Sequence, residues 1–479
     1  MVLQRDQPIH IWGWSEPGET VTATLNGVTA TGTGDPLGQW SLYLAPQAAG
    51  GPFQLTIAGS NKIALDDILI GDVWFASGQS NMEMPLKGFP GSAFVDNAAA
   101  EINDASHPNM RLFFVDHKAS EYPLNDFAGE PSWTVCSPET AAKFSAVAYF
   151  FGRDVANKEH VPIGLIDSTW GGTPGASWVS LDGISSNASL MPVFASWATM
   201  ADEHADVPAI VAAEKREDAA ARSANRPPPK HSWHPDPDSW APAALFNGMV
   251  APAVPFVMKG VIWYQGESDS GAARAPLYSK VFPALISDWR RHWHEGNFPF
   301  LFVQISSFKS NDTETWPIIR EAQLRTLSLT NTAMAVTIDI GNPDNVHPAN
   351  KQAVGDRLAL AARAIAYGEH IEYSGPLFRQ TSAENGGMRV WFDHVDGGLI
   401  AKGGPLEGFE IAGKDHHFVP ATARIDGSTA LVTNAQVTQP EYVRYGWANA
   451  PVVNLFNSIG LPASPFTSEE KIPAPAPLQ

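Results

Sequence analysis

The chain has 479 residues, which is too many for one small hydrophobic core, so we expect two or three domains. Apolar residues make up 44% of the sequence and charged residues 17%, which is typical of an ordinary globular protein. The formal net charge is −19, from 50 acidic and 31 basic side chains, and this argues against DNA or RNA as a partner because phosphate binding needs a basic face. Neutral sugars are compatible with this charge.

The cysteine count and the hydropathy pattern set further limits. Cys136 is the only cysteine, so no intrachain disulfide can form. No apolar run reaches the roughly 18 residues that a membrane-spanning helix needs. The N-terminus carries neither a basic n-region nor an apolar h-region, so the sequence predicts no signal peptide.

Residues 1–67 are expected to form an all-β region. Apolar side chains at Val21, Ala23 and Leu25 alternate with polar neighbours, which is the period of a strand with one buried face. Asn26-Gly27 follows, and this pair is typical of a tight hairpin turn. We therefore predict a β-sandwich or jelly-roll-like layer in this part of the chain.

Residues 68–370 show a different pattern, in which continuous apolar runs are separated by helical segments. Such runs are typical of parallel strands that are covered on both faces. The five runs are Val73–Ala76, Ile163–Ile166, Val261–Tyr264, Phe300–Ile305 and Met334–Ile338. The alternation of strand and helix predicts an α/β fold with a doubly wound parallel sheet flanked by helices.

Two segments depart from this rhythm. Residues 185–245 combine an Ala- and Glu-rich stretch with a proline run, and we interpret them as an insertion over the sheet. Residues 371–479 return to short strands and turns, as in Met388–Phe392. One arrangement is that this C-terminal region packs with residues 1–67, which would make the accessory β domain discontinuous.

Ser80 lies in Gly78-Gln79-Ser80-Asn81, directly after the first apolar run. Gly78 allows a tight turn, and this turn would push the Ser80 hydroxyl into the crevice beyond the carboxyl end of the strand. Gly-X-Ser alone is a weak signal, because the pattern also occurs at Gly175-Ala176-Ser177 and Gly266-Glu267-Ser268, and such a serine also fits a helix cap. The chain contains no Gly-X-Ser-X-Gly elbow.

Two further clusters follow the next two runs. Gly171-Gly172 comes shortly after Ile163–Ile166, and paired glycines let a backbone N–H approach a ligand closely, which is one way to build an oxyanion hole. Gln265 ends the third run and offers an amide N–H to developing negative charge. Glu267 and Asp269 could position loops or, as a weaker interpretation, orient a histidine.

The fourth cluster is Asp344 with His347 three residues later, after the run Met334–Ile338. A carboxylate at this spacing can hydrogen-bond Nδ1 of the imidazole, which leaves Nε2 free to accept a proton. By itself the pair also fits a solvated surface turn. All four clusters, however, lie at the carboxyl ends of their own strands, and in an open α/β sheet those ends share one crevice. Together they predict the site of a serine esterase.

The remaining histidines indicate no metal site. His231 and His234 are spaced His-X-X-His but have neither cysteines nor a His-Glu-X-X-His frame nearby, so we predict no metal and no cofactor. His231 and Trp233 are instead candidates for lining the acceptor side of the cleft. Glu267 paired with another carboxylate would suggest a glycosidase, but that interpretation leaves the other clusters unexplained.

These blocks resemble those of the SGNH hydrolases, and more narrowly the chain is similar to the sialate O-acetylesterase family and related bacterial carbohydrate acetylesterases. The motifs that carry the resemblance are specific and span nearly the whole chain. They are Met1–Arg5, Gly71–Trp74 with Ser77–Pro85, Ser168–Thr173, Gly260–Ser268, Asp344–His347 and Gly460–Phe466. The resemblance implies an SGNH-hydrolase-like, flavodoxin-like sheet for residues 68–370.

The resemblance also implies a role for each motif residue. Ser80 would be the nucleophile, His347 the general base and Asp344 the carboxylate that orients it. The oxyanion hole would consist of the backbone amides of Ser80 and Gly172 and the side chain of Gln265, where other SGNH hydrolases carry an asparagine. Asn81, Glu267, Asp269, His231 and Trp233 are expected nearby as supporting or substrate-binding residues.

The implied substrate is an acetylated carbohydrate, and the sequence leaves its identity open. O-acetylated sialic acid is one alternative, and acetylated xylan or xyloglucan is another. A sialate pocket needs an arginine facing the sugar carboxylate, for which Arg111, Arg274 and Arg320 are candidates. A non-catalytic carbohydrate-binding protein is the alternative from a different class. The resemblance implies a periplasmic or secreted location, with a cytoplasmic one left open because no signal peptide is visible.

Overall fold

The centre of this computed structural model, which describes residues 1–473 apart from 312 and 385, is a sheet with the strand order β13-β12-β11-β7-β10-β8-β9. Every neighbouring pair in this order is parallel except β8 with β9. The strands are β7 (Lys62–Gly78), β8 (His107–Phe114), β9 (Thr134–Cys136), β10 (Ile163–Thr169), β11 (Gly260–Tyr264), β12 (Phe300–Val303) and β13 (Thr332–Ala335). The predicted α/β fold with a parallel sheet is confirmed, and all five predicted runs contribute a strand.

Consecutive residues of β7 show why these strands are continuously apolar. Trp74 points to one face of the sheet and packs edge-on against Phe151, with the ring centroids 4.9 Å apart. Phe75 points to the other face and packs against Trp289, with the centroids 5.6 Å apart. Helices α4 (Ala146–Glu159) and α9 (Ala275–Trp293) supply these two partners, so both faces of β7 are buried.

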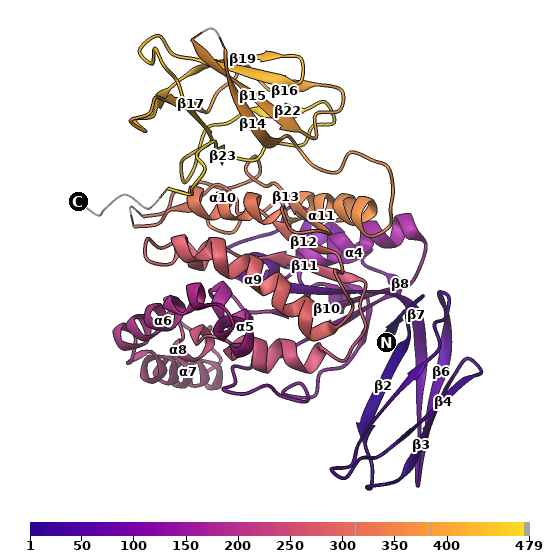
Figure 1. Ribbon diagram of the computed structural model, residues 1–479. Helices are drawn as coiled ribbons and strands as arrows, with labels where there is room; N and C mark the ends of the chain where they lie inside the picture. Colours follow the sequence, from indigo (N-terminus) through magenta and orange to yellow (C-terminus); the bar gives the residue numbers. More distant parts are fainter. Residues whose placement is uncertain (312, 385, 474–479) are drawn as a thin grey trace.

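Further helices complete the two outer layers (Figure 1). Helix α11 (Lys351–Ile365) packs beside α4 and against β13, and α10 (Trp316–Thr326) lies next to α9. The short helices are α1 (Ser80–Glu83), α2 (Ala98–Asp104), α3 (Pro138–Ala141) and α5 (Leu181–Ser185), and residues 185–245 contain α6 (Pro192–Glu203), α7 (Val207–Ser223) and α8 (Pro237–Trp240). None of the described helices has both the length and the apolar character needed to cross a membrane.

The N-terminal β region is continuous with the central sheet through β7. Its strands are β1 (Val2–Gln4), β2 (Ile9–Trp14), β3 (Thr20–Leu25), β4 (Val28–Thr33), β5 (Gln39–Leu44) and β6 (Gly50–Ala58). Asn26 and Gly27 both have positive φ, 49° and 79°, as the predicted hairpin turn between β3 and β4 requires. The predicted domain boundary at residues 67/68 falls inside β7, because this strand pairs with β6 at one end and with β10 and β11 at the other.

The C-terminal β region lies at the opposite end of the central layer from the N-terminal one (Figure 1). Its strands are β14 (Leu377–Glu384), β15 (Gly387–Asp393), β16 (Leu399–Ala401), β17 (Phe409–Ala412), β18 (Val419–Pro420), β19 (Thr422–Asp426), β20 (Thr429–Thr433), β21 (Tyr442–Tyr445), β22 (Leu455–Asn457) and β23 (Phe466–Thr467). The two regions bury separate apolar cores. The suggested packing of the two β regions into one accessory domain is therefore not what the structure shows.

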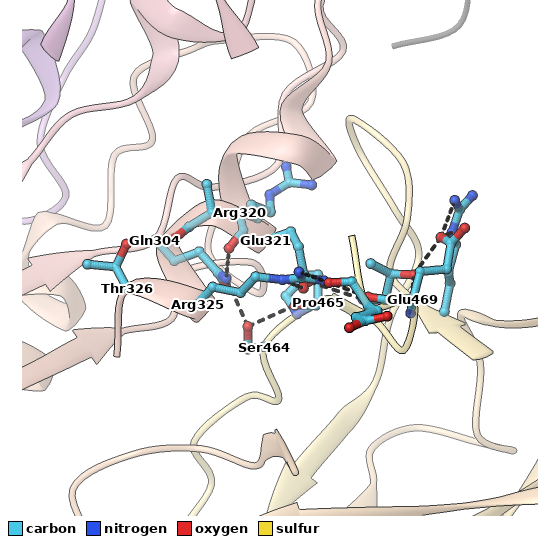
Figure 2. A network of polar contacts seen from close by, with 12 residues as sticks. Gln304, Arg320, Glu321, Arg325, Thr326, Ser464, Pro465 and Glu469 are labelled. Carbon is cyan, nitrogen blue, oxygen red and sulfur yellow. Dashed lines mark hydrogen bonds and ion pairs between the residues drawn. The ribbon is translucent and has the colours of Figure 1, made fainter. Parts of the chain in front are cut away.

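Polar contacts fix the C-terminal region on α10 instead (Figure 2). Gln304 Nε2 donates to Ser464 Oγ at 2.8 Å, and Thr467 N donates to Glu321 Oε2 at 3.1 Å. Arg325 reaches from α10 to the backbone carbonyl of Glu469 at 2.7 Å. These bonds hold the C-terminal region against α10 and the end of β12, far from the N-terminal strands.

Candidate active site

The turn after β7 brings Ser80 to the carboxyl edge of the sheet. Gly78 has φ +133°, and a Cβ at this position would clash with the backbone carbonyl of Tyr264 at the end of β11. The neighbouring backbone is tied to both adjacent strands, since Gln79 N donates to Tyr264 O at 3.0 Å and Trp170 N donates to Gly78 O at 3.1 Å. Helix α1 then begins at Ser80, which therefore lies where β7, β10 and β11 end.

Ser80 and His347 are in direct contact. The Nε2 atom of His347 lies 2.9 Å from Ser80 Oγ, although 267 positions separate the two residues in the sequence. The imidazole is half-buried, and Phe89 packs against it edge-on with the centroids 5.3 Å apart. Burial, and then the positive charge of Lys351, lower the pKa of His347 to about 4. The imidazole is therefore neutral at pH 7 and can accept the serine proton.

Asp344 lies outside this contact. Its side chain is 82% exposed, and its carboxylate is 3.4 Å from the Lys309 ammonium. The side chain of Asn342 accepts from Asp344 N, and that of Asn345 accepts from His347 N, both at 2.9 Å, so the loop forms turns that direct Asp344 to solvent. No hydrogen bond joins Asp344 to the imidazole among the described residues, and its orienting role stays a prediction.

Ser80 and Gly172 line the same cleft, and their backbone N–H groups are the candidate oxyanion donors. Within the described chain, neither Ser80 N nor Gly172 N has a protein acceptor. Gly172 has φ +76°, and a Cβ there would clash with the indole of Trp233. Its carbonyl oxygen is held by Trp240 Nε1 at 2.7 Å, so the peptide is fixed on that side. This arrangement fits the predicted oxyanion hole at Ser80 and Gly172.

Gln265 is placed differently from the prediction. Its side chain is fully buried, and Nε2 donates to Asp269 Oδ2 at 2.6 Å and to Thr173 O at 3.2 Å. Both partners are acceptors, so both amide hydrogens are used inside the protein. Asp269 Oδ2 also accepts from Gly175 N at 2.8 Å. In this structure Gln265 and Asp269 brace the loop that follows Gly172, and Gln265 does not face the cleft.

Asn81 and Glu267 lie behind the nucleophile in a buried polar network. Asn81 Nδ2 donates to Glu267 Oε1 at 2.6 Å and to Val346 O at 3.0 Å. Lys351 Nζ donates to Asn81 Oδ1 at 2.5 Å. Sequence reasoning missed Lys351, although a signal was present, because this lysine shares the apolar face of α11 with Val354.

Glu83, the last residue of α1, is a second functional residue that sequence reasoning missed. Its Oε2 atom accepts from Gly171 N at 2.6 Å, and its Oε1 atom is 3.2 Å from His117 Nε2. The His117 ring stacks on Trp170, with the centroids 4.4 Å apart and the planes 5° apart. Glu83 thus connects the helix that starts at Ser80 with the loop that carries Gly172.

These groups open into a cleft of about 810 Å³. The insertion contributes His231 and Trp233 to its lining, and Trp233 covers Gly172. His231 is held by Asp218 at 2.9 Å. No cluster of three or more potential metal ligands occurs in the described part of the chain. The aromatic residues of the lining, which supply flat apolar surfaces, are Phe89, Trp170, Trp233, Trp240, Phe308 and Trp316.

Of the three arginines considered for a carboxylate site, only Arg274 lines the cleft. Its Nε atom donates to Ser268 O at 2.9 Å, and its guanidinium lies 4.8 Å from the Trp240 ring centroid. Arg111 instead pairs with Asp67 at 2.9 Å at the other end of the sheet. Arg320 is fully buried and donates only to backbone carbonyls in the described chain.

Comparison with known proteins identifies similar chains along nearly the whole sequence. The profile of the family described as "Carbohydrate esterase, sialic acid-specific acetylesterase" matches residues 232–364. Sialate O-acetylesterase of Mus musculus is 32% identical, covering 98% of this chain and 92% of the relative, and that of Homo sapiens is 33% identical, covering 79% and 71%. The crystal structure of XAC1771, a carbohydrate acetylesterase from Xanthomonas citri, is 36% identical with a TM-score of 0.83, covering 98% and 97%.

Proposed function

This chain belongs to the sialate O-acetylesterase family, and on that premise we propose that it hydrolyses O-acetyl esters of carbohydrates with Ser80 as nucleophile and His347 as general base. The observation that carries the proposal is the 2.9 Å contact between Ser80 Oγ and His347 Nε2, beside two N–H groups without a protein acceptor. A non-catalytic carbohydrate-binding protein has no use for a neutral imidazole at hydrogen-bond distance from a serine hydroxyl in its cleft.

The reaction proceeds in two halves. Ser80 Oγ attacks the acetyl carbonyl carbon while His347 Nε2 takes the serine proton, and the carbonyl oxygen becomes an oxyanion that accepts from Ser80 N and Gly172 N. The bond to the sugar oxygen then breaks, and His347 returns its proton to that oxygen. Water repeats the sequence on the acetyl-serine ester, so the products are the free sugar hydroxyl and acetate. Each oxyanion donor contributes roughly 10²–10³ in kcat.

The charges in the cleft bear on the substrate. Arg274 is the only lysine or arginine among its lining residues in the described chain, where its two Nη atoms make no hydrogen bond or ion pair with the protein. A guanidinium fixed in this way suits the carboxylate of an acidic sugar such as sialic acid. The indoles in the lining equally suit the flat apolar faces of neutral sugars, which favours an acetylated polysaccharide such as xylan or xyloglucan as the second candidate.

A panel of substrates tests the activity and the substrate class together. Acetate release is measured from O-acetylated sialic acid, acetylxylan and acetylated xyloglucan oligosaccharides, with p-nitrophenyl acetate as a small ester without a sugar. We expect hydrolysis by the wild-type protein and none by Ser80→Ala. Arg274→Met should raise KM for the sialate ester alone if the guanidinium holds its carboxylate. Absence of hydrolysis of every ester would favour the binding protein over the enzyme.

Family membership also supports a location outside the cytoplasm, in the periplasm or the medium. Fractionation of the native host, with the full-length gene product detected by antibody, tests this location. Recovery in the cytoplasmic fraction alone would contradict it.

A further inference from the structure

A lysine is buried directly behind the proposed catalytic pair. Lys351 is the first residue of α11 and only 1% exposed, and its ammonium lies 5.6 Å from the Tyr264 ring centroid. Burial of a charged ammonium is costly unless hydrogen bonds and an opposite charge compensate for it. An apolar side chain would fill the same place at lower cost, so packing alone does not explain a lysine here.

The side-chain amide of Asn81 links the buried ammonium of Lys351 to the carboxylate of Glu267. Asn81 Oδ1 accepts from Lys351 Nζ, and Asn81 Nδ2 donates both to Glu267 Oε1 and to Val346 O. Asn81 is fully buried, and the acceptors on its nitrogen side fix which end of the amide faces the lysine. The side chain of Asn81 therefore has one orientation in this network.

This orientation matters because of what lies next to each end of the network. Asn81 follows Ser80 in the sequence, and Val346 precedes His347. The bond from Asn81 to Val346 O is therefore a direct connection between the segment that carries the nucleophile and the segment that carries the imidazole. If the amide turned, the contact between Ser80 Oγ and His347 Nε2 would lose its support.

We propose that Lys351 is a positioning residue for the esterase reaction: through Asn81 it holds His347 in hydrogen-bond contact with Ser80. The inference rests on the proposed function and adds to it a residue that never touches the substrate. Displacement of a reacting group by about 1 Å can cost up to roughly 100-fold in rate. Loss of a rigid connection of this kind should therefore lower kcat by a measurable factor.

Lys351 also acts on His347 through its charge. Its ammonium favours the neutral imidazole, and burial lowers the pKa of Lys351 itself to about 7. Burial raises the pKa of Glu267, whose Oε2 atom has no partner in the described chain. The other charged or titratable groups of the same cleft are Glu83, His117, His231, Arg274 and Glu314. Removal of the Lys351 charge therefore raises the pKa of His347 toward the ordinary imidazole value of about 6.5.

Lys351→Met tests the inference, with kcat, KM and the pH profile of p-nitrophenyl acetate hydrolysis as readouts. The acid limb of wild-type activity should lie near the His347 pKa of about 4, because the base works only when it is neutral. The variant should lose between tenfold and roughly 100-fold in kcat with little change in KM, and its acid limb should move to higher pH.

Lys259→Met is the matched control. The Lys259 ammonium also lies over a tyrosine ring, 4.8 Å from the centroid of Tyr367, but at the other end of β11. This variant should retain wild-type kinetics and the wild-type pH profile. Lys259 is only partly buried, so the comparison separates the loss of an ammonium over a tyrosine ring from the loss of the buried ammonium behind Ser80 and His347.

Asn81→Ala provides a second test if Lys351→Met does not fold. It breaks the connection but keeps the lysine charge, so kcat should fall while the acid limb stays near its wild-type pH. Folded variants with wild-type kcat would overturn the inference, provided that the wild-type protein is active and Ser80→Ala is not. An inactive wild-type protein would instead overturn the proposed function and this inference together.

Discussion

Two regions next to His347 differ strongly: the buried polar network behind Ser80 and the exposed turn that carries Asp344. Nε2 faces Ser80, and behind that contact lie Asn81 and Lys351, which are almost completely buried. Asp344, three residues before the histidine, has a side chain that is 82% exposed, and its carboxylate lies 3.4 Å from the ammonium of Lys309. Buried charge-assisted bonds hold a geometry, whereas an exposed ion pair contributes little. The comparison predicts that the buried groups on α1 and α11, rather than the Asp-X-X-His turn, hold the contact between Ser80 and His347.

Helix α1 is short but makes connections on both sides of the nucleophile. Asn81 reaches toward the histidine segment, and Glu83 reaches toward the glycine loop. The general base and the oxyanion donor would thus be held relative to Ser80 by its own neighbours in one helical turn. This arrangement predicts that substitutions on α1 lower kcat more than a substitution of Asp344 does.

The largest effect in this comparison is expected for Glu83→Ala. The variant removes the acceptor of Gly171 N, so the glycine loop loses its contact with α1 and Gly172 N shifts from its alignment with the oxyanion. We expect kcat for p-nitrophenyl acetate to fall toward the roughly 10²–10³-fold loss of a whole oxyanion donor.

Glu139→Ala serves as the control for Glu83→Ala, since Glu139 is 83% exposed and pairs only with Lys143 in the described chain. It should behave as the wild-type protein. An unchanged kcat in Glu83→Ala would mean that the glycine loop is held by other contacts.

The smallest effect is expected for Asp344→Asn. The exposed carboxylate of Asp344 pairs with Lys309 and makes no hydrogen bond to the imidazole in the described chain. Its loss should therefore leave the ring orientation unchanged and alter kcat by less than about tenfold. A loss near 10⁴-fold, as occurs when an orienting carboxylate is neutralised, would show that Asp344 reaches Nδ1 during turnover. That result would support the role predicted from the sequence and reverse the comparison.

The sequence predicted the parallel strands well because both faces of each are covered, which leaves an uninterrupted apolar run. It missed β8 as a strand because Pro108, Asn109 and Arg111 interrupt the apolar pattern there. The position of the C-terminal β region was not predictable from patterns, because residues such as Ser464 and Thr467, which fix it on the end of β12 and on α10, are ordinary polar residues in the sequence.

The site was predictable at the level of strand ends and less so at the level of side-chain direction. Ser80, Gly172 and His347 follow β7, β10 and β13, and the carboxyl ends of these parallel strands share one edge of the sheet. Gln265 also follows a strand, but its side chain turns inward to Thr173 and Asp269, and no spacing rule indicates which way a residue in an irregular turn will point. Lys351 is the instructive omission, because a lysine within an apolar helical face is itself a signal of a buried partner.

The central claim is that His347 activates Ser80, and labelling with a serine-reactive organophosphate tests it most directly. Intact-mass and peptide mass measurements should find one phosphoryl adduct per chain, on Ser80, with none in Ser80→Ala. His347→Ala should be labelled at least about 100-fold more slowly, the minimum expected for loss of a general base. Labelling at a different residue, or at the wild-type rate in His347→Ala, would contradict the account.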